Sequence, residues 1–395
     1  MNRILQELSA MSVEELCQSA AELRDRGKGR VVSFSPKVFI PLTQLCRDFC
    51  RYCTFRRHPQ QGSRLYMTAE EVLETARAGE RAGCREALFV LGERPEERYP
   101  EARLWLRQQG YDSTVEYLHS MCALVLRETR LYPHSNPGTV SYAEVASLRE
   151  VNASMGLMLE STSERLCGAM GPHEQAPSKR PELRLRTLEI AASLKVAFTT
   201  GLLVGIGETE IERLEAMMVI RDLQRQHGHI QEVIIQNFRA KPETPMGSST
   251  ELSLRDTLRT VAAARIVLGE DANIQVPPNL VPGDGGGPES AFLRCGINDW
   301  GGISPVTIDY VNPEAPWPAV EQMRQAMALE GFRLSARFPV YPEYLIKRPE
   351  FVPAPLLERI RSEMTAAGYI PDKGAALPVP REPGRAAHAH SGLEA

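Results

Sequence analysis

Three cysteines within eight residues are the feature of this 395-residue sequence whose types and spacing most directly indicate chemistry. Cys46, Cys50 and Cys53 have the spacing C-x3-C-x2-C. Three thiolates can bind a 4Fe-4S cluster and leave one of its irons open to a small molecule. A closed zinc site needs four protein ligands, so the alternative interpretation is a zinc knuckle that is completed by His58. The number of cysteines favours the iron–sulfur cluster.

Apolar strands that alternate with helices must position this loop. A strand at residues 38–42 leads into the loop, and a capping box at Thr68 begins the first helix after it. Further strands are expected at residues 87–91, 131–136, 154–160, 198–205, 232–237, 274–276 and 303–308. The helices between them are expected at residues 68–82, 113–130, 181–194, 210–226 and 253–268, with others beginning at 141 and 289. Eight such strands predict an α/β fold, a complete or nearly complete (β/α)8 TIM-type barrel, with a doubly wound open sheet as the alternative.

Polar residues gather where the predicted strands end. In barrels of this kind, the C-terminal ends of the strands carry the functional groups. The residues at these ends are Cys46, Glu93, His134, Asn136, Glu160, 205–208, Asn237, Asn279 and Asp299. Their distribution does not depend on the cysteine motif, and it predicts a site at the same mouth of the barrel.

The composition is that of a globular protein with no basic or membrane-spanning character. Hydrophobic residues make up 43% and the net charge is −4, so no nucleic-acid surface is expected. No apolar run has the length of a membrane span, and the acidic N-terminus does not resemble a signal peptide. Eight cysteines without a dense framework favour a reducing, cytoplasmic location. Those outside the motif are expected to stand alone as small buried residues: Cys17, Cys84, Cys122, Cys167 and Cys295.

The sequence divides into four predicted regions. Residues 1–35 are a helical N-terminal lead-in, 36–312 form the barrel, 313–371 add a C-terminal helix and cover, and 372–395 are a disordered tail. The tail is rich in Pro, Ala, Gly and His, and its histidines, His388 and His390, are expected to be solvated rather than metal-binding.

An aromatic residue, Tyr52, precedes the last cysteine of the motif. With it, the stretch resembles the signature of the radical S-adenosylmethionine (SAM) superfamily. The resemblance implies that Cys46, Cys50 and Cys53 bind one 4Fe-4S cluster, whose open iron chelates an exchangeable SAM. One electron from the reduced cluster then splits SAM into methionine and a 5′-deoxyadenosyl radical. Such chemistry needs a dry site, which a barrel mouth supplies.

The same resemblance implies a set of SAM-binding residues. Gly92 and Glu93 follow the second predicted strand, where open backbone groups meet the SAM amino group. Gly205 and Gly207 end the fifth, where glycines let the backbone lie close to adenine. Glu160 ends the fourth and is expected to bind the SAM ribose or amino group. Ordinary strand-to-helix turns and caps remain the alternative for all of them.

Longer stretches resemble one family within this superfamily, the 7,8-didemethyl-8-hydroxy-5-deazariboflavin (FO) synthases of the CofG-subunit type. They are residues 133–138, 154–164, 228–233, 236–242 and 298–305. The resemblance covers about residues 36–345 and implies a radical SAM lyase of coenzyme F420 biosynthesis. Its substrate is 5-amino-5-(4-hydroxybenzyl)-6-(D-ribitylimino)-5,6-dihydrouracil, which is oxidised and cyclised to FO with loss of ammonia. The implied partners are a companion radical SAM enzyme (the CofH-type subunit) that supplies this adduct, and an electron donor such as ferredoxin or flavodoxin.

That substrate requires hydrogen-bonding and proton-transfer groups. Polar side chains at predicted strand ends are suited to bind it: Asn136, Asn237, Arg239 and Asn298. His134 and Asp299 are candidates for the acid or base. Each also has a structural alternative, such as a turn cap at Asp299, and Trp300 is expected to pack.

Two other functions remain open from the sequence. One is a related radical SAM barrel enzyme of menaquinone, biotin or hydrogenase-cofactor assembly, which residues 236–242 and 298–305 disfavour. The other is a non-catalytic protein that binds a metal or an iron–sulfur cluster, which would not need so many polar strand ends. A single cysteine motif in 395 residues predicts that the chain holds only one of the two activities that make FO.

Overall fold

The structure, a computed structural model, describes residues 2–60, 64–281 and 288–372. The predicted tail, with His388 and His390, lies outside the described residues except for Asp372. Among the residues that the structure describes, no helix has both the length and the apolar character needed to cross a membrane.

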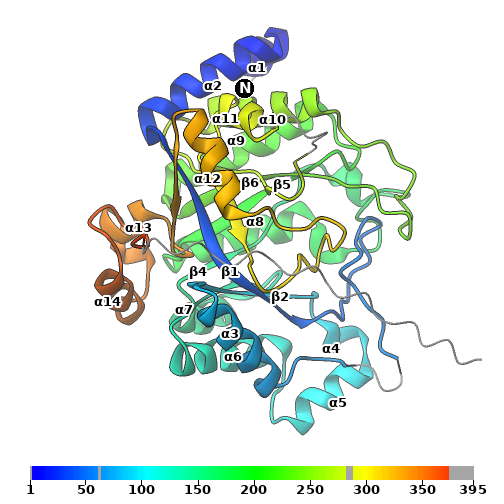
Figure 1. The fold of residues 1–395 in the computed structure, drawn as a ribbon. Coiled ribbons are helices and arrows are strands. Elements are labelled where there is room, and N and C mark those ends of the chain that lie inside the picture. Colours follow the sequence, from blue (N-terminus) through cyan, green and yellow to red (C-terminus); the bar gives the residue numbers. More distant parts are fainter. Residues whose placement is uncertain (1, 61–63, 282–287, 373–395) are drawn as a thin grey trace, which may run out of the picture.

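Eight parallel strands form a closed barrel with helices around the outside (Figure 1). The strands are β1 (Val31–Thr43), β2 (Glu86–Leu91), β3 (Tyr132–Asn136), β4 (Ser154–Gly156), β5 (Phe198–Val204), β6 (Ile230–Asn237), β7 (Ile274–Gln275) and β8 (Asp299–Ile303). β1 pairs with both β2 and β8, which closes the ring and confirms the barrel over the open sheet. A ninth strand, β9 (Arg333–Ala336), pairs with the first half of β1 and was not predicted.

Most of the helices that cover the barrel begin at a Ser or Thr whose side chain caps them. They are α3 (Ala69–Arg81), α6 (Thr114–Glu128), α7 (Tyr142–Val151), α8 (Pro181–Ser193), α9 (Glu210–His227), α10 (Leu254–Leu268) and α11 (Pro288–Arg294). Thr68, Ser141 and Thr209 each cap a helix in a reciprocal capping box with a glutamate three residues later. These local signals explain why the order of helices follows the prediction.

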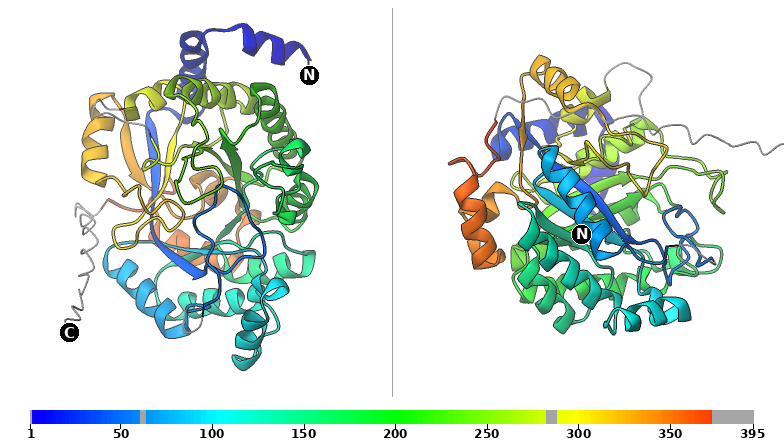
Figure 2. Two further views of the ribbon diagram at one scale, coloured as in Figure 1. Left: turned by 90° about the vertical axis from the view of Figure 1, so that its right-hand side faces the viewer. Right: turned by 60° about the horizontal axis from the view of Figure 1, so that its bottom comes forward.

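Segments from both ends of the chain cover the barrel (Figure 2). At the N-terminus, α1 (Asn2–Ala10) and α2 (Val13–Lys28) precede β1. β1 itself begins at Val31, before the predicted start of the barrel at residue 36. Two short helices, α4 (Pro95–Arg98) and α5 (Pro100–Gln108), occupy the insertion after β2. After β8 come α12 (Val320–Leu329), β9, α13 (Pro342–Ile346) and α14 (Ala354–Glu363). A cluster that includes Phe338 and Tyr341 packs under the first residues of β3 and β5, and so closes the barrel at the N-terminal ends of its strands.

The eighth strand corrects the prediction. It was expected at residues 303–308, but β8 runs from Asp299 to Ile303. Gly301 and Gly302 suggested a turn, whereas in the barrel they make room for side chains from neighbouring strands. A Cβ on Gly302 would lie 2.1 Å from Cδ of Lys37, and one on Gly301 would lie 2.4 Å from Nε2 of Gln275. Asp299 therefore begins its strand and lies far below the mouth.

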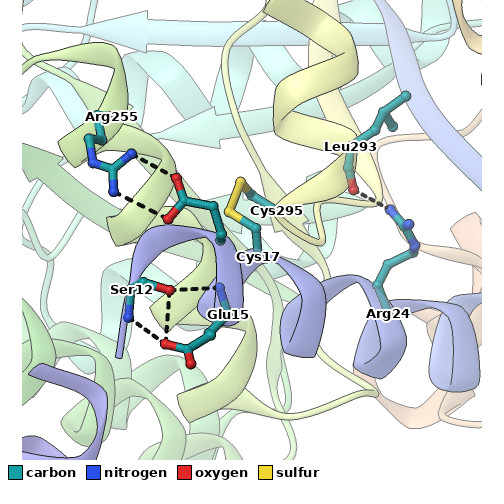
Figure 3. The surroundings of a disulfide bond; sticks show 8 residues. Ser12, Glu15, Cys17, Arg24, Arg255, Leu293 and Cys295 are labelled. Atoms are coloured by element: carbon teal, nitrogen blue, oxygen red, sulfur yellow. Dashed lines mark hydrogen bonds and ion pairs between the residues drawn. A yellow bond between two sulfur atoms is a disulfide. The ribbon is translucent and has the colours of Figure 1, made fainter. Parts of the chain in front are cut away.

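Two cysteines expected to stand alone are joined in a disulfide bond (Figure 3). Cys17 of α2 and Cys295, just after α11, have Cα atoms 4.2 Å apart and are separated by 278 residues in sequence. They meet because α2 packs against α10 and α11, a contact that the spacing of cysteines cannot reveal. Cys84 and Cys122 are free and buried as expected, and Cys167 is free and half-buried.

Candidate active site

A cavity of about 380 Å³ opens at the C-terminal ends of the strands. Seven strands contribute lining residues to it, and the cysteine loop lies at its rim. This volume falls in the range of small-molecule sites. The cavity brings together Cys46, Cys50, Cys53, Gly92, Glu93, His134, Asn136 and Glu160, all of which the sequence singled out.

The cysteine loop is held in place by backbone hydrogen bonds to a distant segment, residues 172–178. The N–H of Phe49 donates to the carbonyl of Gln175 at 2.8 Å, and the N–H of Arg51 donates to that of Pro172 at 2.9 Å. The buried carboxylate of Asp48 accepts hydrogen bonds from the backbone and hydroxyl groups of Ser178. These contacts fix the direction in which the thiols point.

The three thiols fit an iron–sulfur cluster better than a zinc ion. All three are free, half-buried and in contact with the one cavity, whereas His58 lines a separate cavity outside it. Within the described residues, no three His, Cys, Asp or Glu side chains are grouped as ligands of one ion. The cysteines of a cluster bind different irons and need not converge on one point. The placement of His58 therefore argues against the zinc knuckle.

Burial and neighbouring charges in the cysteine loop disfavour thiolates. Burial and the charge of Asp48 raise the pKa of Cys46 to about 12, although the N–H of Glu93 donates to its sulfur at 3.1 Å. Burial also raises the pKa of Cys50, and the charge of Lys179 partly offsets this effect. Thiolates here need a positive partner, which the irons of a bound cluster supply.

Gly92 allows the end of β2 to touch the cysteine loop. A Cβ at this position would lie 1.9 Å from the carbonyl oxygen of Leu45 and 2.7 Å from Cβ of Cys46. The next residue, Glu93, is buried, and its carboxylate accepts hydrogen bonds from the backbone and hydroxyl of Thr139. Burial raises the pKa of Glu93. Close backbone approach is thus a demonstrated role of Gly92, in addition to the predicted one toward SAM.

Glu160, a charged residue of the predicted SAM set, lines the cavity. It is buried and has a left-handed backbone with φ of 66°, which a non-glycine residue adopts at a cost. Its carboxylate forms an ion pair with Lys179 and lies 3.7 Å from a guanidinium nitrogen of Arg184. Burial alone would raise the pKa of Glu160, but these two cations lower it. Glu160 is therefore a fixed negative charge in the cavity wall.

His134 presents one ring nitrogen as a proton acceptor. Its Nδ1 lies 2.7 Å from the hydroxyl of Ser154, and that hydroxyl donates its single proton to the carbonyl of Pro339 at 2.8 Å. Nδ1 must then be the protonated nitrogen, which leaves Nε2 as the acceptor, and the side chain of Asn136 also hydrogen-bonds the ring. Gly156 keeps the space beside Nε2 open, since a Cβ there would lie 3.1 Å from it. Burial lowers the pKa of His134, so the ring is neutral near pH 7.

Asn237 and Arg239, predicted to bind substrate, and Gly205 and Gly207, predicted to bind SAM, do not line the cavity. The amide of Asn237 donates to the carbonyl of Leu280 at 3.2 Å, and Arg239 is paired with Glu251. The N–H groups of Gly205 and Ile206 donate to the carboxylate of Glu208 at 2.7 and 2.9 Å, which closes the turn on itself. Direct roles for these residues remain predictions.

Asn298 and Asp299 lie at the N-terminal end of β8, outside the cavity lining. Both carboxylate oxygens of Asp299 accept hydrogen bonds from Arg337, at 2.7 and 3.0 Å. Asn298 accepts a hydrogen bond from Arg265. Asp299 therefore acts on the cavity through Arg337, whose guanidinium does line it.

Several cavity residues were missed by sequence reasoning. They are Lys37, Glu86, Lys179, Arg184, Glu232 and Arg337. Lys37, Glu86 and Glu232 lie in apolar strands, so a charged residue inside a buried strand was the available signal. Arg337 had no local signal, because its partner Glu232 is 105 residues away.

The fold and the cysteine loop define a radical SAM enzyme. Residues 40–220 match the sequence signature of the Radical SAM superfamily. Methylornithine synthase (TM-score 0.63, 17% identity, 84% of this chain and 93% of that one) has the same fold. So does the FeFe-hydrogenase maturase HydG from Carboxydothermus hydrogenoformans (TM-score 0.66, 19% identity, 92% and 86%). Enzymes of this superfamily carry a 4Fe-4S cluster and SAM, and the three cysteines are the residues that fit the cluster.

Sequence similarity identifies the family more narrowly. The chain is 53% identical over 315 residues to the 7,8-didemethyl-8-hydroxy-5-deazariboflavin synthase of Methanopyrus kandleri, covering 80% of this chain and 93% of that one. It is 49% identical over 346 residues to the FO synthase of Mycobacterium tuberculosis, covering 84% of this chain and 40% of that one. The chain belongs to the 7,8-didemethyl-8-hydroxy-5-deazariboflavin synthase family, and it spans less than half the length of the mycobacterial protein.

Proposed function

We propose that this chain makes FO by oxidising and cyclising 5-amino-5-(4-hydroxybenzyl)-6-(D-ribitylimino)-5,6-dihydrouracil, as a carbon–nitrogen lyase that releases ammonia. The observation that carries the proposal is the 53% identity that extends over 93% of the M. kandleri synthase. When bound, the cluster and SAM supply a 5′-deoxyadenosyl radical. Cys46, Cys50 and Cys53 would hold the cluster at the rim of the cavity, and the substrate would occupy the barrel below it.

The polar walls support a substrate with several hydrogen-bonding groups. Asn136 and His134 project from β3 into the cavity, and Gly156 leaves space beside both. The floor is built from Glu232 and Arg337, whose ion pair measures 3.0 Å. Polar groups at fixed positions between apolar walls can orient a pyrimidine ring, a ribityl chain and a phenol.

His134 is the residue best suited to accept a proton in this reaction. Cyclisation and rearomatisation release protons, and a base must lie within reach of the carbon or nitrogen that loses them. Nε2 of His134 lies at the cavity wall beside Asn136, and burial lowers the pKa of His134, which keeps the ring neutral at physiological pH. We assign it the role of general base, and Asn136 that of a neighbouring substrate ligand.

The outer face of the cysteine loop suits an acidic electron donor such as ferredoxin or flavodoxin. Phe49 lies between the guanidinium groups of Arg56 and Arg98, at 3.7 and 3.8 Å from its ring centre. Arg57 and His58 are exposed beside them. Positive charge this close to the cluster loop would attract a negatively charged protein. The adduct itself would come from a companion radical SAM enzyme of the CofH type.

The test is an anaerobic assay with reconstituted protein, reductant, SAM and the synthetic adduct. FO fluorescence should appear together with 5′-deoxyadenosine and ammonium, and omission of the adduct should abolish the fluorescence. Cleavage of SAM without FO would show that the radical acts on a different substrate. Absence of both products from protein with about four irons would contradict the radical SAM activity itself.

A further inference from the structure

The ammonium group of Lys37 has no polar partner among the described residues. Lys37 projects from β1 into the cavity, and only 8% of the residue is exposed. Its side chain crosses Gly302, and Nζ lies 4.7 Å from the ring centre of Trp317 and 5.6 Å from that of Phe39. Aromatic faces attract a cation but accept none of its three N–H groups in an ordinary hydrogen bond.

Other buried lysines of the described chain have such partners. Lys28 donates to Glu343 at 2.6 Å, Lys179 to Glu160, and Lys241 to Thr54 at 3.0 Å. Lys179 also lines the cavity but is paired with Glu160, so Lys37 is the cavity lysine whose ammonium has no such partner among the described residues.

The carboxylates near Lys37 are occupied by other donors. Glu86 accepts a hydrogen bond from Ser35, and Asp309 accepts one from Asn279 at 3.0 Å. Glu232 is bound by Arg337, Thr199 and Tyr341. These carboxylates raise the pKa of Lys37 while burial, the largest influence, lowers it. They supply a negative field without satisfying its donors.

The Lys37 ammonium opens to the cavity, so a ligand that displaces water from it must offer an acceptor, or the charge would be left unpaired. We propose that Lys37 donates a hydrogen bond to an oxygen of the FO precursor, a pyrimidine carbonyl or the phenol, and thereby orients the substrate beneath the cluster loop. This inference rests on the proposed function and assigns a substrate-positioning residue to it. Trp317 and Phe39 form the apolar sides of the same subsite.

The test compares Lys37→Met, which keeps the shape but removes the charge, with Lys347→Met on the exposed surface as the matched control. Lys37→Met should raise KM for the adduct at least about tenfold and increase the 5′-deoxyadenosine formed per FO, because the substrate is held less well. The ligand-free variant should unfold about 2 °C higher than wild type, since an unpaired buried charge is gone. Lys37→Gln, which keeps a donor, should have an intermediate KM.

Several outcomes would overturn the assignment. One is a wild-type KM and a wild-type ratio of 5′-deoxyadenosine to FO in both Lys37 variants. Another is a lower unfolding temperature of Lys37→Met with an unchanged KM, because that combination indicates a structural role. A different result would contradict the proposed function itself: wild-type protein that cleaves SAM but makes no FO from the adduct. Calorimetry with 5-amino-6-(D-ribitylamino)uracil and with p-cresol identifies the oxygen. Weaker binding of the first probe to Lys37→Met supports the carbonyl, weaker binding of the second supports the phenol, and unchanged binding of both contradicts the contact.

Discussion

Arg265 and Lys37 are both buried cations of this barrel, but their surroundings are opposite. Arg265, at the N-terminal ends of the strands, donates to the carbonyls of Gly296 at 2.8 Å and Ala272 at 2.6 Å and to the side chain of Asn298 at 2.8 Å. Lys37, in the cavity, meets aromatic faces and no acceptor among the described residues. The protein supplies hydrogen-bond acceptors for Arg265 but, among the described residues, none for Lys37.

The same contrast separates the two ends of the barrel. At the N-terminal ends, Asp299 is fully hydrogen-bonded to Arg337, and Arg24 donates to the carbonyls of Leu293 and Ile297. In the cavity that opens at the C-terminal ends, the three thiols, the ring of His134 and the Lys37 side chain line the wall. Asp299 and Arg24 are thus hydrogen-bonded within the protein, whereas the Lys37 ammonium has no such partner among the described residues. Substitutions at the two ends should therefore fail in different ways.

The largest effect is expected from Cys50→Ala. One of three cluster ligands is lost, so reconstituted protein should hold far less iron than the expected four per chain and form no 5′-deoxyadenosine. Iron analysis and chromatography of the SAM products measure both. Cys84→Ala is the matched control, because Cys84 is a free, buried cysteine outside the cavity. Iron content and SAM cleavage at wild-type levels in Cys50→Ala would contradict the assignment of the loop.

A smaller but still large effect is expected from His134→Gln, which keeps a polar side chain but removes the base. FO formation should fall by about 10²–10⁴-fold, the usual contribution of a general base, while SAM is still cleaved. Because the pKa of His134 is lowered by burial, wild-type FO formation should decline only below the ordinary histidine pKa, as the ring becomes protonated. That acidic limb should be absent from the pH profile of the variant. An unchanged limb would assign the base to another residue.

Local signals in the sequence explain how much of this could be predicted. The capping boxes at Thr68, Ser141 and Thr209 and the apolar strands between the helices predict the barrel, and the cysteine spacing is contained within one loop. The position of β8 was missed because Gly301 and Gly302 resemble a turn in the sequence. Only the fold shows that they make room for side chains of neighbouring strands. The sequence shows a glycine pair but not what it makes room for.

The remainder of the site depends on contacts between distant residues. The polar sequence around Lys179 suggests an exposed side chain. In the fold, however, Lys179 packs against Glu160 and lies near Cys50. Asp299 was predicted to lie at the mouth, but it is the first residue of β8 and lies at the N-terminal end of that strand. Cys17 and Cys295 meet only through the packing of helices. Charge and residue type are visible in the sequence, but which end of the barrel they reach is decided by register and packing.

Arg265→Met should affect folding rather than chemistry. Loss of the guanidinium leaves several buried carbonyls without donors, which should lower the free energy of unfolding by about 3 kcal/mol. Urea unfolding measures this, with the exposed Arg26→Met as control. Folded Arg265→Met should retain the wild-type KM for the adduct. An altered KM would show that the two ends of the barrel are coupled. Arg265→Met and Lys37→Met would then no longer differ in kind.

The smallest effect on activity is expected from Cys17→Ser, which removes the disulfide to Cys295. The bond joins α2 to the end of α11, outside the cavity lining, and the reductant of the FO assay would itself open it. FO formation should therefore equal that of wild type. Without reductant, the variant should lose about 2–4 kcal/mol of stability, because the bond restricts the unfolded chain. Reduced wild-type protein is the control and should unfold like the variant. If the two differ, the serine has changed the helix packing itself, and if FO formation falls, the N-terminal helices contribute to the mouth as well as to the fold.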